Sequence, residues 1–130
     1  MYINFHYGQD YLGVKNFPLA CAETCLEIAK KYNVSGRALD LGCALGRTAI
    51  ELAEHFNEVI GSDLSNAFIN ASNDALNDSY PHLKEKVKFL VGDACNLDKS
   101  LGKFNLIFGG NLIDRLYDPK AFLTQIGSFL

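Results

Sequence analysis

A glycine-containing turn directly after a short apolar run constrains the fold of this chain more than any other feature. Residues 38–41 read ALDL, and Gly42 and Gly46 lie in the turn that follows. An apolar run interrupted only by Asp40 is typical of a central parallel strand that is covered on both faces. The glycines can adopt backbone angles that other residues avoid, and they leave no Cβ between the main chain and a ligand. Because a helix is predicted next and open α/β sheets bind ligands at such strand ends, the turn predicts a ligand site.

A second predicted strand, 58–63, ends in Asp63, about 20 positions beyond Gly42. A carboxylate at this position suits a ribose with two free hydroxyl groups, so the sequence indicates a nucleoside ligand. A dinucleotide-binding turn would read G-x-G-x-x-G, but Ala44 and Arg47 stand where its second and third glycines belong. The pattern therefore disfavours a pyrophosphate, and with it a nicotinamide-dependent oxidoreductase, which is kept as one alternative.

Residues 39–46, LDLGCALG, resemble motif I of the class I S-adenosylmethionine methyltransferases, with Ala44 in the place of the usual middle glycine. The chain further resembles the methyltransferase domain of ovothiol biosynthesis, the 4-mercaptohistidine N-methyltransferase family, which also reads LGCA-x-GR at this turn. The other matching segments span nearly the whole chain, and the last is the most specific: 5–8 (FHYG), 16–18 (NFP), 20–21 (AC), 92–97 (GDACNL) and 111–119 (NLIDRLYDP).

The resemblance implies an α/β fold, the Rossmann-like class I methyltransferase domain with a parallel sheet in the strand order 3-2-1-4. We expect an N-terminal aromatic arm over 1–17 and the cofactor-binding domain over 18–130. Apolar runs predict the strands at 38–41, 58–63, 87–91 and 104–110. Helical periodicity and capping residues predict helices over 18–33, 46–56, 66–77 and from Pro119 onward.

Two of the predicted helices carry more detailed expectations. In the helix over 66–77, Ser65 is the expected N-cap, and Phe68, Ala71 and Ala75 form the expected inner face. In the helix over 46–56, His55 is expected on the solvated face.

A complete domain of this family continues with strands five to seven, which this chain lacks, so the expected domain is truncated at its C-terminus. Strand 4 would then be a bare hydrophobic edge of the sheet. Either the missing strands lie outside this chain or a second copy covers the edge. We expect a homodimer through strand 4 or through the last helix.

The resemblance also implies S-adenosylmethionine as the cofactor. Gly42 and Gly46 would let the main chain meet the methionine end, with Asp40 directed towards its ammonium group. The residues expected to bind the cofactor are Asp40, Gly42, Cys43, Gly46, Asp63, Leu64, Asp93, Ala94 and Asn111.

At the nucleoside end, Asp63 would hold the ribose hydroxyls and Leu64 would pack on adenine. Asp93 and Ala94 would recognise the adenine edge, because a carboxylate at a strand end can accept the exocyclic amino group. A turn-capping role for Asp93 after Gly92 is the alternative. The presence of Asp63 and of motif I favours the binding role.

Methyl transfer from a sulfonium is a single in-line displacement, so the protein mainly has to position the two reactants. A characteristic set of catalytic side chains is therefore not required in the sequence. The resemblance places Asn111 at the methyl-transfer site, and it makes His6 and Tyr7 candidates to orient the acceptor or to take a proton. Asp114 and Arg115 fit surface capping and ion pairing slightly better than contact with the acceptor.

Composition excludes several other classes. A net charge of −3 argues against nucleic acid as the main partner. No apolar run is long enough for a membrane span, and no signal peptide opens the chain. The histidines are not spaced as a zinc site, so we expect no metal. The four cysteines fit small buried residues in a reducing cytosol, which predicts a cytoplasmic location.

The sequence thus predicts a methyltransferase that uses S-adenosylmethionine to methylate a small molecule, by resemblance a ring nitrogen of mercaptohistidine. A module that binds S-adenosylmethionine without turnover is the main alternative.

Overall fold

The structure is a computed structural model that describes residues 17–110 and 116–130. Most of the predicted aromatic arm, with His6 and Tyr7, lies outside the described residues. So do Asn111, Asp114 and Arg115.

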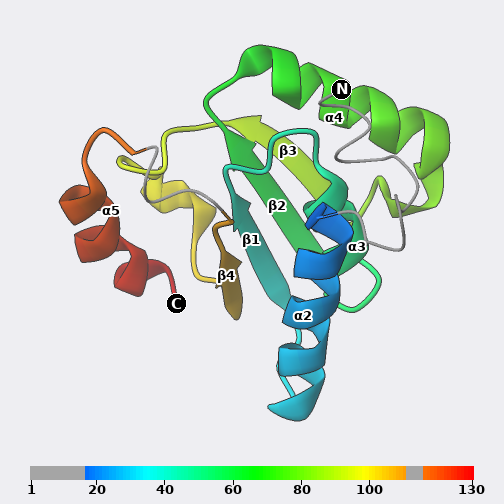
Figure 1. Cartoon of the computed structure of the whole chain (residues 1–130), viewed down its shortest axis with the longest axis horizontal. Helices are drawn as coiled ribbons and strands as arrows, with labels where there is room; N and C mark the ends of the chain where they lie inside the picture. Colours follow the sequence, from blue (N-terminus) through cyan, green and yellow to red (C-terminus); the bar gives the residue numbers. More distant parts are fainter. Residues whose placement is uncertain (1–16, 111–115) are drawn as a thin grey trace.

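Four parallel strands form one sheet in the order β3-β2-β1-β4, which confirms the predicted order (Figure 1). Their bounds are Arg37–Leu41 for β1, Glu58–Asp63 for β2, Val87–Val91 for β3 and Leu106–Phe108 for β4. In the register, Leu39 of β1 lies opposite Ile60 of β2 and Ile107 of β4. The two inner strands are almost wholly buried, as a parallel sheet covered on both faces requires.

β4 is shorter than the predicted 104–110. The N–H of Phe104 donates to the carbonyl of Phe129 at 2.6 Å, so this residue is tied to the C-terminal segment instead of to β1. Because that partner lies far along the sequence, the local apolar pattern could not reveal it.

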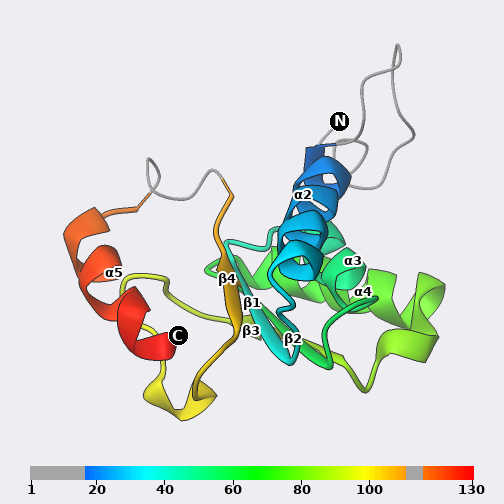
Figure 2. The same ribbon diagram turned by 90° about the horizontal axis from the view of Figure 1, so that it is seen from below.

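The helices cover the two faces of the sheet (Figure 2). α2, α3 and α4 lie on one side, and α5 lies on the other side beyond β4. The helices are α2 Phe17–Lys31, α3 Arg47–Leu52, α4 Asn66–Ser79 and α5 Pro119–Ile126, with short 3-10 turns at Pro81–Leu83, Lys99–Leu101 and Gly127–Phe129. No helix in these described parts of the chain is long and apolar enough to cross a bilayer.

Each face of the sheet has its own core, because side chains alternate along a strand. Ala38 and Val59 pack with the α3 and α4 side chains in one cluster. Leu39 and Ile60 pack with Phe122 of α5 in the other. The sheet is therefore a buried layer between two apolar cores.

Three helical predictions need correction. α3 ends at Leu52 rather than at residue 56. His55 is half-buried, and its Nε2 lies 2.7 Å from the carbonyl oxygen of Val34, so it joins the loop after α2 to the end of α3. In α4 the expected N-cap Ser65 is confirmed, since its hydroxyl accepts from the N–H of Phe68, but the buried residues are Ile69, Ser72 and Leu76.

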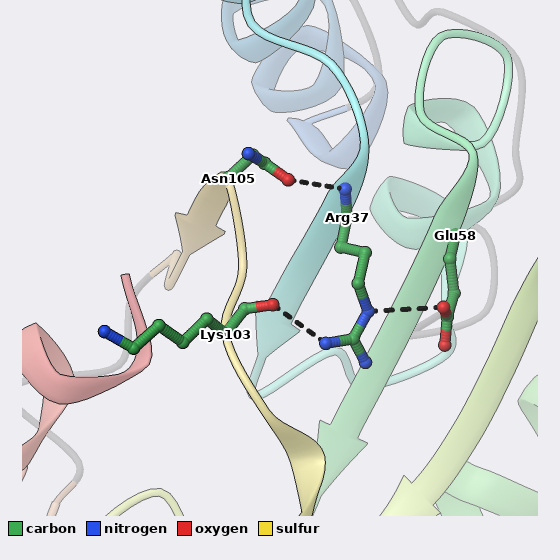
Figure 3. A network of polar contacts seen from close by, with 4 residues as sticks. All are labelled: Arg37, Glu58, Lys103 and Asn105. Carbon is green, nitrogen blue, oxygen red and sulfur yellow. Dashed lines mark hydrogen bonds and ion pairs between the residues drawn. The ribbon is translucent and has the colours of Figure 1, made fainter.

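The amino ends of the strands are held by Arg37 (Figure 3). Its N–H donates to Asn105 Oδ1 at 3.0 Å, its Nη1 donates to the carbonyl of Lys103 at 2.8 Å, and its Nε pairs with Glu58 at 3.2 Å. The guanidinium also lies 4.4 Å from the centre of the Phe104 ring. This network fixes β1, β2 and the start of β4 at the edge of the sheet opposite the predicted ligand site.

Candidate cofactor site

The carboxyl ends of β1, β2 and β3 meet at one edge of the sheet, because the strands are parallel and in close register. Leu41 lies opposite Ser62, and Asp63 lies opposite Val91. The residues that follow these positions therefore gather at the same edge: Gly42, Leu64 and Asp93. This is the edge at which open α/β sheets bind ligands.

The turn after β1 is anchored to β2. The N–H groups of Gly42 and Cys43 both donate to the carbonyl of Ser62, at 2.8 and 3.0 Å. Gly42 has a φ of 68° and is exposed, so a glycine is needed here for the turn and leaves the main chain open to a ligand. Gly46 N–H donates to the carbonyl of Cys43 at 2.9 Å and closes the turn.

Ala44 adopts a left-handed conformation, with a φ of 50°, in the place of the family's usual middle glycine. Such a conformation costs an alanine about 1–2 kcal/mol. Two contacts hold it there. Its N–H donates to Asp63 Oδ2 at 2.9 Å, and its carbonyl accepts from the buried Ser72 hydroxyl of α4 at 3.0 Å.

The structure shows a packing role for Gly46. A Cβ at Gly46 would lie 2.6 Å from the Phe89 ring and 3.0 Å from the Ser72 hydroxyl. Gly46 is buried, so its missing side chain admits these neighbours. Its φ of 84° also favours glycine.

Cys43 points its side chain into the core. The residue is 4% exposed, and burial raises the pKa of its thiol. A Cβ on Gly61 would lie 3.2 Å from its sulfur atom. Any part of Cys43 in cofactor binding therefore belongs to its main chain.

Asp40 has a buried side-chain oxygen that lacks a hydrogen-bond partner among the described residues. The residue is 2% exposed, and Oδ2 has no hydrogen-bond partner among the described residues. Burial, together with the charge of Asp63, raises the pKa of Asp40 to about 8, against a hydrogen bond from the Ala49 backbone that lowers it. An unpartnered carboxylate oxygen beside the turn suits a cationic group such as an ammonium, so the residues present fit the methionine end of the cofactor.

Asp63 and Leu64 lie together at the end of β2. Besides Ala44, Asp63 accepts from the N–H of Ser65, with Oδ1 at 2.9 Å. Each carboxylate oxygen has two lone pairs, so both can still accept a hydroxyl. Leu64 is 65% exposed, an apolar side chain open to a flat ring beside the carboxylate.

Asp93 has the turn-capping role that its position after Gly92 offers as the alternative to adenine recognition. Its Oδ1 accepts from the N–H of Cys95 at 2.8 Å. Its Oδ2 accepts from the hydroxyl of Tyr117 at 2.5 Å, while the neighbouring Ala94 is buried. The backbone cap alone does not prevent recognition of a ligand, because it occupies Oδ1 and leaves Oδ2 to a side-chain donor that can rotate away.

Sequence reasoning missed two residues of this site, Ser72 and Tyr117. Ser72 could have been found from its spacing, since it falls between Ile69 and Leu76 on one helical face. No sequence signal pairs Tyr117 with Asp93. The structure brings Asp40, Gly42, Asp63, Leu64 and Asp93 to one edge, whereas His6, Tyr7 and Asn111 lie outside the described residues.

Comparison with known proteins gives the family. Residues 38–130 match the methyltransferase domain family. The chain is 34% identical over 93 residues to magnesium-protoporphyrin O-methyltransferase of Rhodobacter capsulatus, a match that covers 70% of this chain and 39% of that protein. It is 30% identical over 89 residues to norajmaline N-methyltransferase of Rauvolfia serpentina, covering 68% of this chain and 30% of that protein. The chain thus spans less than half the length of these relatives.

Solved structures agree with the fold. The glycopeptide N-methyltransferase MtfA, complexed with sinefungin, superposes with a TM-score of 0.72 at 18% identity, covering 85% of this chain and 45% of that one. An S-adenosylmethionine-dependent methyltransferase from Clostridium acetobutylicum gives 0.71 at 21% identity, with the same shares covered. By its sequence match and its strand order, this chain belongs to the methyltransferase domain family, with the Rossmann-like class I fold whose cofactor is S-adenosylmethionine.

Proposed function

We propose that this domain binds S-adenosylmethionine at the carboxyl edge of β1, β2 and β3, and that it transfers the methyl group to a nitrogen of a small molecule. The observation that carries the proposal is a buried oxygen of Asp40 that has no hydrogen-bond partner among the described residues, shortly before the exposed Gly42. When bound, the cofactor would supply a methyl carbon on a positively charged sulfur, which a positioned nucleophile can attack while the sulfur leaves as the neutral thioether of S-adenosylhomocysteine.

The two ends of the cofactor suit different residues. Asp40 would accept the ammonium group of the methionine end, and the exposed main chain at Gly42 would let that end approach. Asp63 would accept the ribose hydroxyls with the lone pairs that its backbone donors leave free. Leu64 would pack on the adenine ring, since its exposed side chain lies next in sequence to that carboxylate.

At the adenine edge, Asp93 would accept the amino group, with Ala94 beside the ring. The methyl acceptor would be oriented by Asn111, His6 and Tyr7. The support for these three is the resemblance of segments 5–8 and 111–119 to the mercaptohistidine enzymes.

We propose a ring nitrogen of 4-mercaptohistidine as the acceptor on the same resemblance. The relative from Rauvolfia serpentina is an N-methyltransferase, whereas that from Rhodobacter capsulatus is an O-methyltransferase, so the two relatives differ on the atom methylated. A domain that binds the cofactor without turnover is the second candidate.

Calorimetry of the 130-residue chain with S-adenosylhomocysteine tests the binding step, with NAD as the comparison ligand. We expect binding of the first and none of the second. The opposite result would make the domain a nicotinamide-binding one.

Transfer of labelled methyl groups to 4-mercaptohistidine, with histidine as control acceptor, then tests catalysis. Transfer to 4-mercaptohistidine supports the enzyme, and binding without transfer to either compound supports the module.

We also propose that two copies pair through the free edge of β4 or through α5. The support is that β4 is only half-buried at the end of the sheet and that Leu123 of α5 is 58% exposed. Sedimentation should give a dimer that Leu123→Glu dissociates, if the helix forms the interface.

We propose a cytoplasmic location, with all four cysteines as free thiols.

A further inference from the structure

The segment after β3 is bonded to the segment around α5 at several points. Tyr117 donates to Asp93, and the Cys95 thiol donates to the carbonyl of Asp118 at 3.4 Å. Gln125 of α5 accepts from the N–H of Leu97 at 3.0 Å, and its amide also donates to the carbonyl of Cys95. The residues that follow Tyr117 and those that follow Asp93 are therefore fixed relative to each other.

Within this fixed frame, the Tyr117 side chain is the exposed part. The residue is 72% exposed, so its ring loses little buried surface when the hydroxyl leaves Asp93. The bond itself is a short, charge-assisted one, at 2.5 Å. It raises the pKa of Tyr117 to about 12, because a phenol that donates to a carboxylate holds its proton.

With Tyr117 in place, both oxygens of Asp93 already have a donor, one from the Cys95 backbone and one from the phenol. The backbone donor is two residues away in a buried turn and cannot leave without unfolding that turn. The phenol can rotate into solvent. The oxygen that Tyr117 covers is therefore the one that another donor can take over.

We propose that the Tyr117 hydroxyl stands in for the adenine amino group on Asp93, and that cofactor binding displaces it. This inference rests on the proposed function. The amino group replaces one donor by another on the same oxygen, so the carboxylate is never left without a partner. The displacement also means that the tyrosine two residues before α5 responds to whether the cofactor site is filled.

The first test is the affinity of Tyr117→Phe for S-adenosylhomocysteine, measured by calorimetry. This variant keeps the ring and removes only the hydroxyl that must be displaced. We expect binding about three- to tenfold tighter than that of the unmodified chain, as the loss of one competing charge-assisted hydrogen bond predicts. Tyr32→Phe is the matched control, since Tyr32 is 67% exposed after α2, and it should change nothing.

The second ligand is S-inosylhomocysteine, whose base presents an oxygen where adenine has the amino group. It has no donor on the C6 substituent, and its N1–H is offset from that position, so Tyr117→Phe should tighten its binding less than that of S-adenosylhomocysteine. An equal gain for both ligands, or an unchanged or weaker affinity for S-adenosylhomocysteine, overturns the inference.

The third measurement follows the tyrosine directly, by the chemical shift of its labelled Cζ carbon at neutral pH. On addition of S-adenosylhomocysteine, the Tyr117 signal should move towards that of the solvent-exposed Tyr32. A bound complex with an unmoved signal overturns the inference alone. Failure of the unmodified chain to bind S-adenosylhomocysteine overturns the proposed function with it.

Discussion

The backbone N–H of Ala44 donates to the Asp63 carboxylate at 2.9 Å, which joins the turn after β1 to the end of β2. The family usually has a glycine at the position of Ala44. The φ of Ala44, 50°, is unfavourable for an alanine. The carboxylate proposed to hold the ribose thus also holds the turn proposed to hold the methionine end. Stability and cofactor affinity should therefore change together at this position.

Replacement of Asp63 tests that coupling. In Asp63→Ala the Ala44 and Ser65 N–H groups lose their acceptor, so we expect unfolding free energy to fall by about 1–3 kcal/mol. Affinity for S-adenosylhomocysteine should fall at least tenfold, as for one lost charge-assisted hydrogen bond of about 1.5–3 kcal/mol. Urea unfolding and calorimetry measure the two effects. Asp74→Ala, on the exposed side of α4, is the control, and an equal loss there would remove the assignment.

Ala44→Gly should stabilise the protein slightly. Glycine removes the left-handed strain, which raises the unfolding free energy by about 1–2 kcal/mol. Its greater freedom in the unfolded chain lowers the unfolding free energy by roughly 0.5–1 kcal/mol. The net gain in unfolding free energy is therefore between about 0 and about 1.5 kcal/mol in the same urea experiment.

The matched control for this substitution has the opposite sign. Ala67 is exposed and lies within α4, where Ala67→Gly should cost about 0.5–1 kcal/mol. If Ala44→Gly destabilises as much as Ala67→Gly, the turn is not strained at Ala44.

Ser72→Ala should destabilise the turn from the other side. Ser72 is fully buried, and its hydroxyl lies 3.0 Å from the Ala44 carbonyl and 2.8 Å from that of Phe68. Loss of this donor leaves the Ala44 carbonyl with only the weak Cys43 thiol donor at 3.9 Å, at a cost of about 1–3 kcal/mol in unfolding free energy. Ser79→Ala at the exposed end of α4 should stay within about 0.5 kcal/mol of the unmodified protein.

Local signals were enough for most of the fold. β2 and β3 begin and end where the apolar runs 58–63 and 87–91 predict. Ser65 caps α4 as expected, and Asp118 caps α5 directly before Pro119, because capping depends on neighbours in sequence. Parallel strand order also brought Asp63 and Asp93 to one edge, so the positions of the site residues could be predicted.

The rest depends on contacts between distant residues. The N–H of Phe104, in the predicted start of β4, is bonded to Phe129, and the buried Ser72 of α4 is bonded to the Ala44 carbonyl of a distant turn. The bond between Tyr117 and Asp93 is of the same kind. Local sequence patterns predict secondary structure and capping, but they do not show which distant residue a side chain or backbone group contacts.

The pKa of Asp40, raised to about 8, predicts how stability changes with pH. Below pH 3.8, the ordinary pKa of an aspartate, Asp40 is protonated in both the folded and the unfolded state, so the pKa shift does not lower the unfolding free energy. As the pH rises from about 4 to about 8, only the unfolded state ionises freely, so Asp40 lowers stability progressively over this window. Asp40→Asn should remove this fall, which urea unfolding at a series of pH values measures. An identical pH profile in the variant would contradict the raised pKa.

The same group predicts that cofactor binding releases a proton. At pH 7 Asp40 is mostly protonated in the free protein, since its pKa is about 8. An ammonium group next to the unpartnered oxygen would favour the carboxylate and lower that pKa, so a proton leaves as the ligand binds. Calorimetry with S-adenosylhomocysteine in phosphate and in Tris, buffers with different heats of protonation, should reveal the release as a buffer-dependent enthalpy. Asp40→Asn should bind without that dependence, and if the variant keeps it, the proton comes from another group and the ammonium lies elsewhere.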